Sequence, residues 1–102
     1  MPRKAPPSFA SETRLLIDLG ARLRLARLRR RLTTTTVAER CNLSRPTLAK
    51  VERGDPSVTL GSYVRVLSVY GIQGDLVAVG ADDTLGRRLQ DLALPALRKG
   101  RR

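Results

Sequence analysis

With 102 residues the chain can form one small domain, and its formal net charge of +11 favours a polyanionic partner, with nucleic acid ahead of an anionic membrane surface or an acidic protein. A hydrophobic content of 41% with only 3% aromatic residues predicts an aliphatic core built from helices. One cysteine and no histidine exclude an internal disulfide and a metal site rich in these residues, and no apolar stretch approaches the roughly 20 residues that span a bilayer.

The first ten residues, MPRKAPPSFA, contain three prolines and two basic residues without periodicity, which predicts a flexible basic arm over 1–10. The first helix is expected from about Ser11 to about Arg31, because apolar residues recur there at steps of three and four, at Leu16, Leu19, Leu23 and Ala26. Arginines occupy most of its remaining circumference, and a second basic cluster ends the chain. Basic clusters are usually solvated faces, but two of them around a nearly balanced middle segment fit a module that straddles phosphates.

The second helix is expected over VAERC, residues 37–41, after a run of four threonines. Thr33 is one candidate N-cap, while Thr36 with Glu39 has the spacing of a capping box and competes for the boundary. Asn42 then stands where a chain often turns through a left-handed conformation. Cys41 follows the apolar pattern of this helix, so we interpret it as a small core residue rather than a redox sensor.

The third helix is short and well delimited by its sequence. Ser44 is its expected cap, Pro46 lies in its first turn, where a missing amide hydrogen costs nothing, and Gly54 ends it. The side chains expected to face inward are Leu43, Leu48 and Val51. Two short helices joined by a tight turn predict a helix-turn-helix unit within an all-α domain of five short helices, residues 11–80.

The fourth helix is expected after the turn GDPS, with Thr59 as its cap and an end before Gly71. Its apolar side is expected to carry Leu60, Val64 and Leu67. The following segment DLVAV, residues 75–79, has two interpretations: a short helix capped by Asp75, or a β-strand that pairs across a dimer axis.

The last segment, 81–102, is expected to be a short C-terminal extension with a basic tail. ADDTLGRRLQDL predicts a weak helix capped by Asp82 or Asp83, with an apolar side made of Leu85, Leu89 and Leu92. LPALRKGRR contains proline, glycine and four basic residues, which predicts a mobile tail.

The outer side of the third helix is the candidate DNA-reading surface, because an α-helix fits the major groove and its first turns lie nearest the base edges. Arg45 can donate two hydrogen bonds to guanine, Lys50 can donate to the same edge or to a phosphate, and Pro46 or Ala49 can contact a thymine methyl group. Arg53 and the loop through Ser57 are expected to contact phosphate.

Three stretches carry a resemblance to a known family: LGARLRLARLRRRLT at 19–33, VAER at 37–40 and LSRPTLAKVERG at 43–54. Together they resemble the lambda-repressor-like, or XRE-type, helix-turn-helix regulators over about residues 15–72. The resemblance implies a five-helix lambda-repressor-like domain and a structural ion pair between Arg27 and Glu52. In this chain Thr34 stands where the family usually has a DNA-contacting glutamine, and Asn42 replaces the usual turn glycine.

The candidate DNA-binding set combines the pattern and the resemblance. Thr34 is included because its hydroxyl can still bond a phosphate. The complete set is Thr34, Ser44, Arg45, Pro46, Thr47, Ala49, Lys50, Arg53 and Ser57.

Residues 65–92, RVLSVYGIQGDLVAVGADDTLGRRLQDL, resemble the C-terminal extension of HipB-like antitoxins. This resemblance implies a repressor that binds operator DNA, autoregulates its operon and neutralises a HipA-like toxin kinase. The alternative is a stand-alone phage-repressor-like regulator with no toxin partner. A pure interaction protein that has lost DNA binding comes third, and RNA binding fourth, because no aromatic platform exists for unstacked bases.

A homodimer is expected, since one such module makes few base contacts and two can bind half-sites about one helical turn apart. The expected dimer surface is Leu67, Val69, Tyr70, Ile72, Leu76 and Val79. Tyr63 and Tyr70 are expected to be core or dimer contacts rather than platforms for bases.

No nucleophile has a partner at a suitable spacing and no glycine loop could cradle a phosphate, so we expect no enzyme, no cofactor and a cytoplasmic protein.

Overall fold

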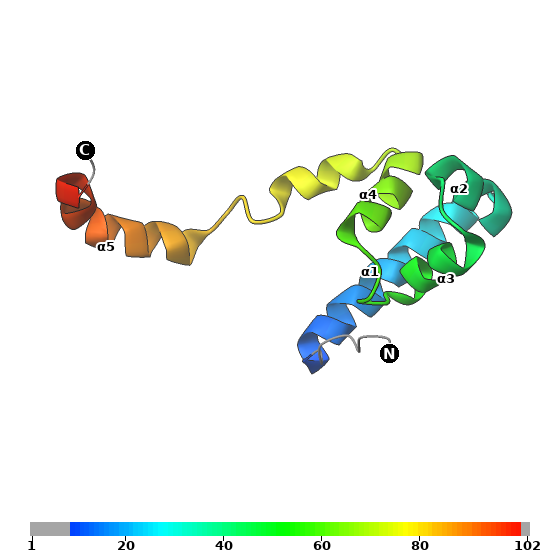
Figure 1. Ribbon diagram of the computed structural model, residues 1–102, viewed down its shortest axis with the longest axis horizontal. Coiled ribbons are helices and arrows are strands. Elements are labelled where there is room, and N and C mark those ends of the chain that lie inside the picture. The colour runs from blue at the N-terminus through cyan, green and yellow to red at the C-terminus, as the bar shows by residue number, and fades with distance from the viewer. Residues whose placement is uncertain (1–8, 101–102) are drawn as a thin grey trace, which may run out of the picture.

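The computed structural model describes residues 9–100, with side chains for residues 9–93. The expected arm therefore lies largely outside the described residues, as do the last two residues of the expected tail. The described part is all-helical, as the sequence predicts, and contains no strand. Its elements in chain order (Figure 1) are the α-helices α1 (Ala10–Arg29), α2 (Thr34–Cys41), α3 (Arg45–Arg53) and α4 (Leu60–Val69), the 3₁₀ helix η1 (Gln73–Ala78) and the α-helix α5 (Thr84–Gly100).

Short polar residues set the boundaries of the central helices. The hydroxyl oxygen of Thr33 accepts a hydrogen bond from the Thr36 amide at 3.1 Å, so Thr33 is the cap of α2 and the competing capping box is not the boundary. Asn42 adopts the left-handed conformation, with φ 55° and ψ 43°. Ser44 caps α3 by accepting from the Thr47 amide at 3.2 Å. The order of helix, tight turn and helix is thus specified by local sequence.

Helices α1 and α3 cross at two glycines. A Cβ atom on Gly20 would lie 2.6 Å from the amide nitrogen of Gly54 and from the carbonyl oxygen of Val51, which is closer than atoms can pack. Gly54 also has a φ of 73°, a left-handed conformation that ends α3. Backbone therefore rests on backbone here, which sets the distance of α3 from α1.

The core lies between α1, α2, α3 and α4: α3 packs on α1, and α2 packs on α3 and α4. Val37, Leu48, Val51 and Val66 are fully buried, at 0% exposure, and Leu23 is buried at 1%. The α1 stripe is as expected, with Leu23 and Ala26 buried and Leu16 and Leu19 half-buried. An aliphatic centre of this kind follows from the composition.

The buried face of α4 differs from the expected one. Leu60 is 70% exposed, and the side chains that enter the core are Tyr63, Val66, Leu67 and, just after the helix, Tyr70. The Tyr63 hydroxyl donates to the carbonyl oxygen of Asp55 at 2.9 Å, so its ring can be buried with its polar end satisfied. Of the three expected residues, Leu67 is buried, Val64 is half-buried and Leu60 is exposed, because the two tyrosine rings and Val66 occupy the core. Both tyrosines are core residues.

The segment after α4 also departs in part from expectation. Residues 73–78 form a 3₁₀ helix, which excludes the strand interpretation, and Asp75 lies inside this helix rather than capping it.

The carboxylate of Asp83 accepts a hydrogen bond from the Gly86 amide at 2.9 Å, so Asp83 caps α5. The predicted tail is wrong as far as Gly100, because α5 continues through it. Leu, Ala, Arg and Lys favour helix strongly, and they outweigh the single Pro95 in this stretch.

Candidate nucleic-acid interface

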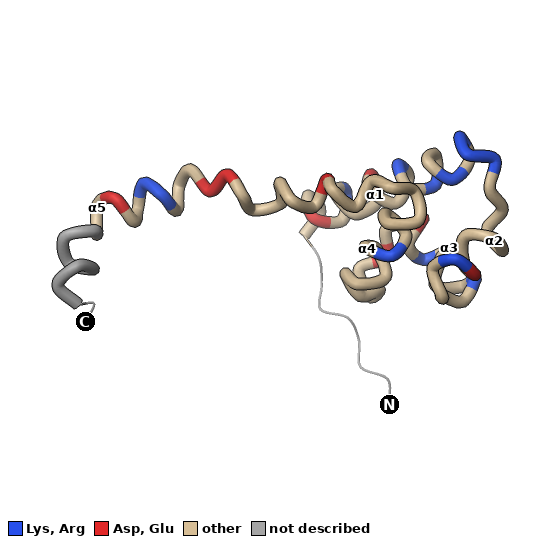
Figure 2. Tube along the Cα trace, turned by 90° about the horizontal axis from the view of Figure 1, so that it is seen from above, with Lys and Arg blue, Asp and Glu red and all other residues tan. Residues whose placement is uncertain are grey.

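The α2–α3 unit presents the outer side of α3 at the surface of the bundle. Arg45, Pro46 and Lys50 are exposed, whereas Thr47 and Ala49 are half-buried at the edge of this side. On the inner side Leu48 and Val51 are fully buried. The orientation of the helix is therefore determined by its apolar residues. Figure 2 marks in blue the basic positions along α3.

The cations of this side carry no intramolecular ion pair within residues 9–93. No carboxylate in that range lies within salt-bridge distance of Arg45, Lys50 or Arg53, while three other ion pairs do form. Arg53 is exposed at the last position of α3. Unpaired cations on one side of a helix can bind anionic groups without first breaking a contact within the protein.

Ser44, Thr47 and Ser57 use their polar atoms within the chain. The Ser44 hydroxyl donates to Thr47 Oγ1 at 2.9 Å, in addition to its capping bond. Ser57 donates to one Asp55 carboxylate oxygen from both its amide, at 2.8 Å, and its hydroxyl, at 2.7 Å. These three residues shape the ends of α3 and the loop that follows it. Thr34 differs, because it is exposed in the first turn of α2, where backbone amides point outward.

Asp55 organises the loop after α3. The hydrogen bonds from the Ser57 hydroxyl and amide lower the pKa of its carboxyl group, and the nearby charges of Lys50 and Arg53 lower the pKa further. The sequence already contained a signal for this contact, because an aspartate two residues before a serine often forms an Asx turn. We identified GDPS as a turn, but not Asp55 as the residue that holds it.

Arg27 and Glu52 form a buried, two-point ion pair behind α3. Arg27 Nε donates to Glu52 Oε2 at 2.7 Å and Nη2 donates to Oε1 at 3.1 Å, with side-chain exposures of 10% and 8%. Arg27 Nη1 also donates to the carbonyl oxygen of Leu32 at 3.1 Å, a contact that the sequence did not indicate. The hydrogen bond to Glu52 is the main cause of the raised pKa of Arg27. One side chain thus connects α1, the loop before α2 and the end of α3.

The arginines of α1 divide into two groups that the sequence could not separate. Arg30 donates to the carbonyl oxygens of Ala26, at 3.0 Å, and Tyr70, at 2.9 Å, and its guanidinium lies 5.3 Å from the centre of the Tyr70 ring. Arg27 and Arg30 therefore hold the fold together. The arginines that remain on the exposed side of α1 and just after it are Arg14, Arg22, Arg24, Arg29 and Arg31.

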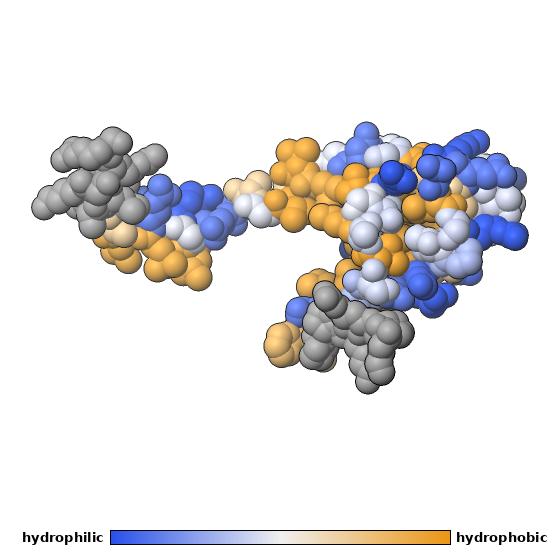
Figure 3. Space-filling model, viewed as in Figure 1, coloured by the Kyte–Doolittle hydropathy of each residue, from blue (hydrophilic) through white to orange (hydrophobic). Residues whose placement is uncertain are grey.

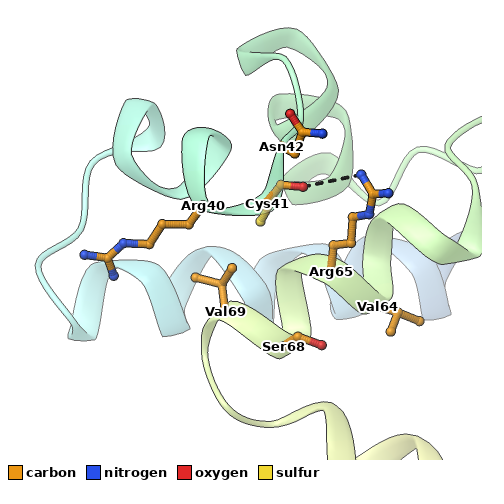
Figure 4. A pocket seen from close by; sticks show the side chains of 7 residues that line it. All are labelled: Arg40, Cys41, Asn42, Val64, Arg65, Ser68 and Val69. Carbon is orange, nitrogen blue, oxygen red and sulfur yellow. Dashed lines mark hydrogen bonds between the residues drawn. The ribbon is translucent and has the colours of Figure 1, made fainter.

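A shallow pocket of about 410 Å³ lies between the end of α2 and α4 (Figure 4). Arg65 Nη1 donates to the carbonyl oxygen of Cys41 at 3.5 Å, which places a cation at the C-terminus of α2, and Arg40 points away from Arg65. Burial raises the pKa of the Cys41 thiol, so this cysteine is protonated and unreactive near neutral pH. The pocket contains no arrangement of nucleophile and base.

The described residues offer neither a metal site nor a helix that could span a membrane. No group of three or more His, Cys, Asp or Glu side chains could hold a metal ion there. Among the helices of the described part, none combines the length and the apolar character needed to cross a bilayer.

Comparison with known proteins identifies the domain. A family described as a helix-turn-helix domain matches residues 18–79, more than half of the chain, and this match covers α2, α3, α4 and η1 together with the greater part of α1. No curated protein and no solved structure matches the chain. The match coincides with the part of the structure in which two short helices flank a left-handed turn at Asn42. The chain therefore belongs to the helix-turn-helix domain family, whose fold is that of a DNA-binding regulator.

Proposed function

We propose that the protein is a sequence-specific transcriptional repressor of the XRE type that inserts α3 into the major groove of operator DNA. The observation that supports this function best is the two-sided character of α3. One side is fully buried at Leu48 and Val51, and the other exposes Arg45 and Lys50, which form no ion pair within residues 9–93. A helix held rigidly by its inner side can present donors to base edges with little loss of entropy on binding.

The residues of the interface have different roles in this proposal. Arg45 donates to guanine O6 and N7, and Lys50 donates to the same edge or to a neighbouring phosphate. Pro46 and Ala49 contact a thymine methyl group. Thr34 and Arg53 bind phosphates, which fixes the register of the protein on the duplex. Ser44, Thr47 and Ser57 support these contacts by holding the ends of α3 and the loop after it.

The repressor acts as a homodimer in this proposal, because one α3 reads only a few base pairs. Residues 11–80 are the DNA-binding domain, residues 1–10 an arm and residues 81–102 an extension outside it. The protein performs no catalysis, uses no cofactor and works in the cytoplasm. The dimer surface expected from the sequence needs revision, because Leu67 and Tyr70 are buried in the core of each copy.

Selection of bound duplexes from a random pool tests the proposal. We expect enrichment of a two-fold symmetric site whose halves lie one or more helical turns of about 10 base pairs apart. The double variant Arg45→Ala/Lys50→Ala should lose this enrichment. Arg87→Ala is the matched control, since it removes an exposed arginine from the polar side of α5 and should leave the selected site unchanged. A pool that stays random with the unaltered protein would contradict the proposal.

A second candidate function is that of an antitoxin that neutralises a HipA-like toxin kinase and represses the shared operon. Besides the resemblance of residues 65–92, it is supported by the apolar side chains that η1 and α5 leave exposed, among them Val77 at 82% and Leu85 at 68%. Co-expression with the products of the neighbouring genes tests it. A kinase-like neighbour that co-purifies and loses its toxicity supports the antitoxin role, and neighbours that do not bind leave the stand-alone repressor.

A further inference from the structure

An apolar groove runs along α1, beside α4 and η1. It has a volume of about 670 Å³, and most of its lining is aliphatic, including Leu16 and Leu19 of α1 and Leu76 of η1. Its edges leave Leu15 69% and Leu60 70% exposed. Figure 3 shows apolar surface over η1 and the adjoining part of the bundle. Apolar surface of this extent on a small protein marks a binding site.

The same chain carries a helix whose apolar side has no partner. Leu85, Leu89 and Leu92 of α5 recur at steps of four and three and are 68%, 57% and 83% exposed. Figure 1 shows α5 extending away from the bundle, and Figure 3 shows apolar side chains on one of its sides and polar side chains on the other. An amphipathic helix in this situation fits a groove lined by aliphatic side chains.

We propose that α5 of one copy lies in the groove of a second copy, and that the two copies exchange this helix reciprocally. The proposal rests on the homodimer proposed above and names its interface. The part of the groove on α1 runs from Leu15 to Arg29, about 21 Å at 1.5 Å per residue. Helix α5 runs from Thr84 to Gly100, about 24 Å by the same measure. Groove and helix therefore agree in length as well as in chemistry.

The course of the chain favours a second copy over the same copy as the occupant. Leu76 and Val79 already line the groove, and only residues 79–83 lie between η1 and α5. At Val79 the backbone is extended, with φ −67° and ψ 118°, and the chain leads away from the bundle. The radius of gyration is 18.5 Å, against about 13 Å for a compact chain of this length. A helix held outside its own bundle is available for exchange.

Charge complementarity agrees with this occupant. Each copy has a net charge of +11, so two copies repel each other unless their contact is apolar and brings acidic groups to basic ones. The groove lining includes Arg22 and Arg29. Helix α5 brings the carboxylate of Asp83 at its N-terminal cap. Because each copy contributes one helix and one groove, the interface is two-fold symmetric and closes at two copies.

Light scattering on the full chain, without DNA, tests the interface. The unaltered protein is expected to be a dimer at micromolar concentration. Leu89→Asp should raise the dimer dissociation constant by about 100-fold or more, because a carboxylate would be buried in the aliphatic groove. Gln90→Asp adds the same charge on the polar side of α5 and should remain dimeric. Circular dichroism should show both variants folded, since Leu89 is exposed in one copy. A monomeric unaltered protein, or a dimeric Leu89→Asp, overturns the proposal.

Cross-linking separates exchange between copies from folding back within one copy. In a Cys41→Ala background, Leu89→Cys is combined with Leu60→Cys and treated with a short bis-maleimide. A covalent dimer is expected, and the control pair with Gln90→Cys in place of Leu89→Cys should give much less. A cross-linked monomer with no covalent dimer overturns the exchange.

If Leu89→Asp stays dimeric and still selects the same duplex, the interface is wrong and the proposed function stands. If the dimer behaves as expected but selects no duplex, the proposed function fails and the interface stands.

Discussion

Arg27 near the end of α1 and Arg30 at its C-cap lie three residues apart, and both bind other parts of the fold. Arg27 holds a buried carboxylate at two points, and Arg30 donates to two carbonyl groups while covering the ring of Tyr70. Sequence reasoning reached Arg27 only through the resemblance to a known family. It missed Arg30, because periodicity assigns a residue to a side of a helix and says nothing about which carbonyl groups that side meets.

Arg27→Ala is expected to destabilise the fold strongly. Glu52 would remain buried without its partner, which costs about 3–5 kcal/mol, whereas Arg24→Ala removes an exposed arginine of the same helix and should change the free energy of unfolding by less than about 0.5 kcal/mol. Urea denaturation measures both. The double variant Arg27→Met/Glu52→Leu should recover much of the loss, because an apolar pair can replace a buried ion pair. Equal stability of the two single variants would show that the pair contributes nothing.

The pKa of Tyr70 predicts a loss of stability in alkaline solution. Burial raises this pKa from 10.0 to about 12. Because the folded state holds the proton more tightly than the unfolded state, the contribution of Tyr70 is complete below about pH 10 and is lost as the pH rises toward 12. The full loss is on the order of 2–3 kcal/mol. Thermal unfolding between pH 8 and pH 12 measures it.

Tyr70→Phe is the matched variant for this effect. The Tyr70 hydroxyl has no hydrogen-bond partner in the described part of the chain, so its removal should change stability at pH 7 by less than about 1 kcal/mol. The variant should also lose less stability between pH 9 and pH 11. Burial raises the pKa values of Tyr63 and Cys41 as well, and these groups leave a smaller alkaline decline in the variant. An unchanged decline would show that Tyr70 is not its main source.

At the scale of the elements, the contact between α1 and α3 determines how far the outer side of α3 projects. Gly20 and Gly54 let the two backbones touch, and the Arg27–Glu52 pair ties the end of α3 to α1. Since α3 is only nine residues long, its position depends on these contacts more than on its own helical propensity.

Gly20→Ala and Gly61→Ala should have opposite effects. Alanine favours helix over glycine by about 1 kcal/mol, and at Gly61 in α4 its methyl group would meet only the Thr59 hydroxyl, at 3.8 Å, so stability should rise. At Gly20 the methyl group would strike the backbone of α3, so stability should fall by about 1–3 kcal/mol. Thermal denaturation compares them. A stabilised Gly20→Ala would contradict the close crossing.

Helix ends could be predicted from sequence far better than helix sides. Thr33, Asn42, Ser44 and Thr59 act locally, through their own hydrogen bonds or backbone angles, so a few neighbouring residues suffice to predict them. On α4, periodicity correctly placed Leu67 in the core but wrongly placed Leu60 there. It did not indicate Tyr63, whose hydroxyl donates to a loop residue eight positions earlier. The outer side of α3 was easier to predict, because Leu48 and Val51 must both face the core and this leaves only one orientation for the helix.

For the whole molecule, the net charge of +11 makes DNA binding strongly dependent on salt. If Lys50 and Arg53 of both copies neutralise about four phosphates, affinity should fall about 150-fold between 50 and 200 mM salt. Fluorescence anisotropy on a labelled duplex measures this dependence. Lys50→Ala should make the dependence shallower if Lys50 binds phosphate, and leave it unchanged if Lys50 reads a base. An affinity that does not change between 50 and 200 mM salt would exclude a phosphate-binding surface.

The central claim is that the outer side of α3 reads base sequence, and the dissociation constant of Arg45→Ala tests it most directly. It is compared with that of the unaltered protein on the duplex selected from the random pool and on a scrambled duplex of equal length. We predict a loss of about 5- to 150-fold on the selected duplex, equivalent to about 1–3 kcal/mol, and a much smaller loss on the scrambled one. Equal losses on both duplexes would show that Arg45 contacts a phosphate rather than a base. No loss on either duplex would contradict the claim that the outer side of α3 binds DNA.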